Sequence, residues 1–112
     1  MRKPHKLMIH RADYYAAVYG DDAGAKSISF PTATHPQFAC NFQEAGWKVV
    51  QLYSQRDQAC AASCFTLESG VYDTAKPGDR VVFNTTNYRV IGKQDLSNLN
   101  RVYRIDLEAE VQ

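Results

Sequence analysis

Residues 77–109 constrain the fold most strongly, because this stretch reads as three successive strands joined by two polar connections. It opens with the turn signal Pro-Gly-Asp at 77–79, in which proline fixes φ and glycine accepts positive φ. A short run of strand-forming residues follows at 80–83, and the polar residues 84–87 have the length of a hairpin connection. The stretch therefore predicts an antiparallel meander with one buried and one solvated face.

The apolar residues of this hairpin predict its pairing. If Phe83 faces Tyr88, then Val81 faces Val90, and one face of the hairpin carries four apolar side chains. Residues 92–100 are then expected to form a longer polar loop before the final strand.

The final strand has the most regular alternation in the chain. Its predicted buried face carries Tyr103, Ile105, Leu107, Ala109 and Val111. Its predicted solvent face carries Arg104, Asp106, Glu108 and Glu110.

Alternation also predicts strands at residues 6–11, 38–43 and 60–68. In the last of these, Phe65 and Leu67 are expected to point into the core, with Cys60, Ala62 and Cys64 on the other face. Residues 12–19 fit a helix by their alanines and a strand by their tyrosines, so both assignments stay open.

A helical period replaces the alternation between residues 47 and 58, where Val49, Leu52 and Tyr53 share one side. Residues 20–37 read as a long loop, and a compact domain rarely keeps one of that length without using it. The sequence thus predicts a single domain, 1–112, that is mainly β. We expect a small antiparallel β-barrel or sandwich with one short helix and a long loop after the first strand.

The totals exclude several classes of protein. At 112 residues with 45% hydrophobic and 22% charged residues, the chain is expected to fold around one small core. A net charge of +1 argues against a protein that grips a nucleic-acid backbone. The sequence contains no apolar run long enough for a membrane span and no signal peptide at its start, and its three cysteines fit a reducing cytoplasm.

The candidates for chemistry are few. Cys60 and Cys64 could share a metal on a helix, but structural zinc needs four ligands and no histidine lies near them in sequence. The three histidines are distant in sequence from both thiols, and no phosphate-binding or hydrolase motif occurs. We therefore expect core packing for the thiols, no catalytic residues, no metal and no cofactor.

An interface explains the charged strand face better than chemistry does. Arg104 lies beside Asp106 and Glu108, which places both signs on one surface and suits self-association. The basic N-terminal cluster and the acidic C-terminal strand differ in sign, as a head-to-tail ring would require.

Four segments together resemble the head-completion, or head–tail connector ("stopper"), proteins of long-tailed bacteriophages. They are HKLMIHR at 5–11, FACNF at 38–42, SCFTL at 63–67 and PGDRVVFNTTNYRVIGKQDL at 77–96. The Gly-Arg-Glu-like element that the family often carries before its helix is replaced here by Glu-Ala-Gly-Trp at 44–47.

The resemblance implies a structural virion protein rather than an enzyme. It would be made in the cytoplasm of the bacterial host and would form a ring of six or twelve copies in the virion neck, beneath the portal and its adaptor. The ring would retain packaged DNA in its channel, receive the tail and touch no membrane.

Two contact surfaces are expected on this basis. The first is an interface or channel loop with Tyr19, Asp21, Asp22, Lys26, Phe30 and His35. The second contains Lys93, Asp95, Asn98, Arg101, Arg104, Asp106 and Glu108. The alternatives left open are a small OB-like barrel that binds single-stranded nucleic acid, another neck or tail component such as a tail terminator, and a small enzyme that uses Cys60 or Cys64.

Overall fold

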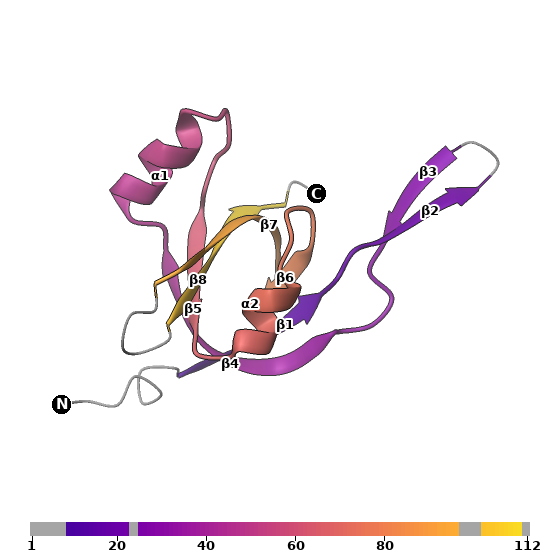
Figure 1. The fold of residues 1–112 in the computed structure, drawn as a ribbon, viewed down its shortest axis with the longest axis horizontal. Coiled ribbons are helices and arrows are strands. Elements are labelled where there is room, and N and C mark those ends of the chain that lie inside the picture. The colour runs from indigo at the N-terminus through magenta and orange to yellow at the C-terminus, as the bar shows by residue number, and fades with distance from the viewer. Residues whose placement is uncertain (1–8, 23–24, 97–101, 111–112) are drawn as a thin grey trace.

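The structure is a computed structural model that describes residues 9–22, 25–96 and 102–110, without the side chains at 21, 22, 25 and 26. Six strands close into an antiparallel barrel, in the order β1 (His10–Tyr15), β4 (His35–Glu44), β5 (Ala62–Thr66), β8 (Tyr103–Ala109), β7 (Thr86–Asp95) and β6 (Arg80–Phe83) (Figure 1). The other elements are β2 (Val18–Asp22), β3 (Ala25–Ser29), α1 (Trp47–Ser54) and α2 (Ser69–Thr74). The predicted fold class is confirmed, and the structure adds a second short helix.

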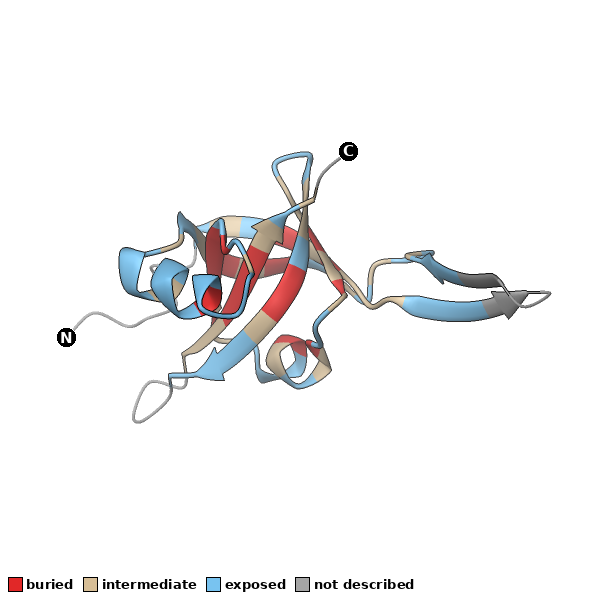
Figure 2. Ribbon diagram, turned by 90° about the horizontal axis from the view of Figure 1, so that it is seen from above, coloured by how far each residue is buried: buried red, intermediate tan, exposed pale blue. Residues whose placement is uncertain are grey.

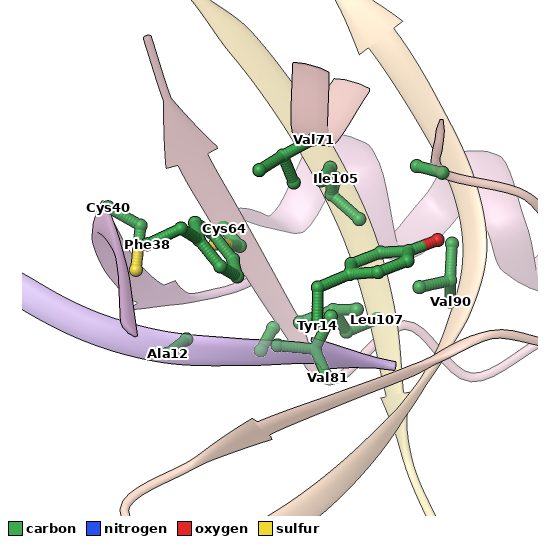
Figure 3. Close-up of a cluster of buried hydrophobic side chains, with 12 residues drawn as sticks. Ala12, Tyr14, Phe38, Cys40, Cys64, Val71, Val81, Val90, Ile105 and Leu107 are labelled. Carbon is green, nitrogen blue, oxygen red and sulfur yellow. The ribbon is translucent and has the colours of Figure 1, made fainter. Parts of the chain in front are cut away.

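Side chains from every barrel strand and from the α2 segment fill the barrel interior (Figure 3). The buried residues are Ala12, Tyr14, Phe38, Cys40, Ala62, Cys64, Val71, Ala75, Val81, Val90, Ile105 and Leu107. The prediction for 60–68 was wrong about which face points inward, because Phe65 is only half-buried while Cys64 lies in the core. A narrow barrel that already encloses the rings of Tyr14 and Phe38 has room only for the small-residue face of β5.

The β6–β7 hairpin pairs two residues away from the predicted register. Val81, not Phe83, lies opposite Tyr88, and only Asn84 and Thr85 connect the strands. Both connecting residues have positive φ, 51° and 64°, as a type I′ turn requires. Because side chains alternate with a period of two, the shift keeps the predicted apolar residues on one face.

The loop predicted at 92–100 is shorter than expected. Strand β7 continues to Asp95, which pairs with Tyr103, after a register irregularity between Val90 and Gly92. The remaining loop falls mostly within 97–101, outside the described residues.

The ambiguous stretch 12–19 is strand, shared between β1 and β2, and the long loop predicted at 20–37 is largely regular structure. Most of it belongs to the β2–β3 hairpin, and its end begins β4. The predicted strand 6–11 lies partly outside the described residues, and β1 starts at His10.

Helix α1 confirms the predicted helix but ends at Ser54. Tyr53 is buried and Val49 half-buried, whereas Leu52, predicted to lie on the same side, is 41% exposed. Helix α2 was not predicted, and it carries the buried Val71 to the barrel core. Neither described helix has the length and apolar character needed to cross a bilayer.

Candidate assembly surfaces

The hairpin of β2 and β3, which we call the arm, extends away from the barrel (Figures 1 and 2). Its strands pair in continuous register from Val18 opposite Ser29 to Asp22 opposite Ala25, and they form a two-stranded sheet of their own. Tyr19 lies opposite Ile28, and their side chains are 66% and 59% exposed. Large apolar side chains so far from any core are typical of a surface that another molecule covers.

One side of the arm's root is held by the buried carboxylate of Asp79. Its Oδ1 accepts a hydrogen bond from the Ala17 amide at 2.9 Å, and its Oδ2 accepts from the Lys76 amide at 3.2 Å and from the Tyr14 hydroxyl. Burial, and then the hydrogen bond and charge of Asp79, raise the pKa of Tyr14 far above its ordinary value. Asp79 therefore ties the chain leading into β2 to the barrel core.

The turn that carries Asp79 also supports Tyr19. Gly78 has φ of +98°, a value that disfavours other residues. A Cβ atom added to Gly78 would lie 2.9 Å from the Tyr19 hydroxyl oxygen, so the tyrosine rests against this turn. The Pro-Gly-Asp signal in the sequence thus fixes both the start of β6 and the direction of the arm.

The return strand of the arm is anchored on the opposite side of the root. The Phe30 ring lies under the Arg80 guanidinium, with 4.1 Å between the ring centroid and Cζ. Arg80 in turn donates hydrogen bonds from Nε and Nη2 to the two carboxylate oxygens of Glu110, at 3.2 and 3.0 Å. Further along, His35 Nε2 and Thr74 Oγ1 are 3.0 Å apart.

The residues predicted for the first contact surface therefore divide into two groups. Tyr19 lies on the exposed arm, whereas Phe30 and His35 attach the chain to the barrel. Asp21 and Lys26 lie opposite each other in the arm's register, and Asp22 lies opposite Ala25.

The second predicted surface contains a buried polar cluster beneath α1. Asp106, predicted to face solvent, is fully buried. Its Oδ2 accepts a hydrogen bond from the Tyr53 hydroxyl at 2.6 Å, its Oδ1 accepts one from the Ser63 hydroxyl at 3.4 Å, and Arg104 Nε lies 2.8 Å from Oδ1. The prediction failed because α1 covers this part of the outer wall of the barrel, and strand alternation carries no information about such a cover.

The α1 cluster depends on Gly92, since the Tyr53 hydroxyl occupies the place where a Cβ at residue 92 would lie. Burial, followed by the Asp106 hydrogen bond and charge, raises the pKa of Tyr53. The same burial and the Asp106 charge raise the pKa of the nearby Cys60 thiol.

The other residues of the second surface do not join this cluster. Lys93 Nζ donates to the Tyr72 carbonyl at 2.7 Å and lies 4.4 Å from the centroid of the Tyr72 ring. Glu108 pairs with Arg89, and Asp95 lies at the far end of β7. Asn98 and Arg101 lie outside the described residues.

A groove of about 530 Å³ crosses the ends of β6, β7 and β8. Its lining residues are Ala59, Ala61, Arg80, Arg89, Glu108, Ala109 and Glu110. Each arginine of the groove is paired with a glutamate, so the groove is not an unneutralised basic surface of the kind that binds phosphates.

The cysteines do not converge on a polar cleft. Cys40 and Cys64 lie in the barrel core, and Cys60 is buried beneath α1. Among the described residues, no group of three or more His, Cys, Asp or Glu side chains could hold a metal ion. A thiol and a carboxylate do meet at Cys60 and Asp106, but they are covered by the helix.

Sequence reasoning missed the outward side of α1. Trp47 is 67% exposed there, and Val50 is exposed on the same side of the helix. The spacing of three residues between them was a usable signal, because residues i and i+3 lie on one helical face.

No protein-family model matches this chain, and no curated protein matches its sequence.

Proposed function

We propose that this protein is a structural ring subunit in the neck of a long-tailed bacteriophage virion. In this proposal six or twelve copies form a ring beneath the portal and adaptor, which closes the DNA-filled head and provides the surface to which the tail attaches. Packaged DNA passes through the channel or is retained there, and the protein performs no catalysis.

The observation that carries the proposal is the combination of a closed barrel with an exposed apolar arm. All six barrel strands have a neighbour on both sides, so the barrel offers no long free edge. The arm instead presents Val18, Tyr19 and Ile28 to solvent. A rigid body with one projecting adhesive element suits a repeating subunit, since heterologous contacts close into rings when the rotation permits.

The use of the charged and nucleophilic side chains also supports a structural role. Arg80, Arg89 and Arg104 are each paired with a carboxylate, and the three thiols are buried. Residues held in this way stabilise the subunit and are poorly placed to act on a substrate.

The test is assembly, measured by sedimentation velocity and negative-stain imaging at increasing protein concentration. We expect closed rings, formed either alone or beside the portal-side ring protein encoded next to this chain. Ile28→Ser should reduce ring formation, while Leu52→Ser, which removes an exposed apolar side chain from α1, should leave it unchanged. Both variants should keep wild-type stability within about 0.5 kcal/mol, because neither site is buried. Monomers at every concentration, even beside that partner, would contradict the proposal.

The same experiment separates the alternatives. A barrel that binds single-stranded nucleic acid would stay monomeric and shift an oligonucleotide in a salt-dependent way, whereas the paired arginines of the groove favour no such shift. A tail terminator would also form rings, but would bind tail-tube ends rather than the portal side.

A further inference from the structure

The arm has two unpaired strand edges. β2 and β3 bond to each other, and among the described residues neither forms a ladder with a barrel strand. An isolated two-stranded hairpin is at best marginally stable in water, and an open edge is a template for another strand. Its attachment at Asp79 and Phe30 fixes the root but leaves both edges available for pairing.

The sequence of the arm distinguishes between the possible pairings. β2 contains Asp21 and Asp22, whereas β3 contains Lys26. Pairing β2 with β2, or β3 with β3, would bring like charges together, which destabilises a sheet. Pairing β3 of one copy with β2 of another brings opposite charges together, and it is the heterologous contact that a ring requires.

Rotational symmetry makes this pairing geometrically consistent. Rotation about an axis parallel to the arm places β3 of one copy beside β2 of the next. Because β2 and β3 run antiparallel within each arm, the new contact is antiparallel as well. Such a rotation does not change height along the axis, so Ser29 of one copy comes level with Val18 of the next, as it is level with Val18 of its own copy.

We propose that the arms of neighbouring copies pair edge to edge, β3 with the next β2, and close into a second antiparallel barrel around the ring axis. This inference rests on the proposed ring function and specifies the contact that holds the ring together. The pairing removes every free edge of the arms and aligns Tyr19 and Ile28 of all copies in one continuous belt.

The test uses two single-cysteine additions at level positions in the arm, Val18→Cys and Ser29→Cys. Both sites are exposed, while the three native cysteines are buried and serve as the background. The two variants are mixed, assembled and treated with a mild thiol oxidant, and disulfide-linked dimers are measured on a non-reducing gel. A mixture of Val50→Cys and Leu52→Cys, exposed on α1, is the matched control.

We expect linked dimers in the mixture of arm variants, and loss of that band in either arm variant alone and in the control. Equal dimer formation by Ser29→Cys alone or by Val18→Cys alone would indicate a two-fold contact and overturn the inference. Sedimentation of the same samples separates the two levels of the argument. Rings without the linked dimer refute only the pairing of arms, whereas the absence of rings refutes the proposed function and this inference with it.

Discussion

Thr85 shows how a single residue can oppose the fold that contains it. It occupies the second position of the β6–β7 turn with φ of 64°, where a β-branched side chain is strained and glycine is preferred. Thr85→Gly should therefore stabilise the protein by up to about 1 kcal/mol, as the left-handed penalty disappears. The midpoint of urea unfolding measures the change. Thr86→Gly, inside β7, is the control and should destabilise by about 0.5–1 kcal/mol. A lower midpoint for Thr85→Gly would contradict the turn assignment.

Gly92 belongs to the same scale, because its missing side chain makes room for the Tyr53 hydroxyl. Gly92→Ala should push Tyr53 away from Asp106 and destabilise the protein by about 1–3 kcal/mol. Tyr53→Phe should also destabilise, because Asp106 then loses a hydrogen-bond donor. The double variant should be clearly less unstable than the sum of the two, since both changes disturb one contact. Additive effects in urea unfolding would show that the two residues act separately.

At the scale of elements, the orientation of the arm depends on a carboxylate that belongs to a different hairpin. Asp79 receives hydrogen bonds from the Tyr14 hydroxyl and from the amides of Ala17 and Lys76. Asp79→Asn cannot accept all of them with both oxygens, and we expect a loss of about 2–3 kcal/mol. Amide hydrogen exchange should quicken most at Ala17 and along β2. Asp73→Asn, at an exposed site in α2, is the control and should leave exchange in the arm unchanged.

The element scale also explains why α1 matters to the barrel wall. Tyr53, Cys60 and Ile91 form a second small core outside the barrel. This core and the helix above it exclude water from Asp106, which alternation alone assigns to solvent. The helix therefore converts an expected charged surface into an internal hydrogen-bond cluster.

At the scale of the whole molecule, two buried tyrosines set an alkaline limit to stability. The pKa values of Tyr14 and Tyr53 are both raised in the folded protein, chiefly by burial. Above about pH 10 the unfolded chain loses these protons while the folded protein retains them. Stability is therefore complete below that pH and should fall as pH rises, by about 1.4 kcal/mol per pH unit for each tyrosine. Urea unfolding between neutral and strongly alkaline pH measures this slope. Tyr53→Phe should make the slope shallower, and an unchanged slope would exclude Tyr53 as a contributor.

The sequence by itself determined the strand-rich fold class, the turn at Pro77–Asp79, the inward residues of β8 and the position of α1, because these follow from local periodicity and turn chemistry. Only the tertiary structure decided which face of β5 points inward, that Asp106 is buried, that 20–37 contains a projecting hairpin, and which predicted contact residues anchor the arm. The reason is physical: a strand's pattern records that its two faces differ, but which face is enclosed depends on the volume inside the barrel and on the elements that cover its outer wall.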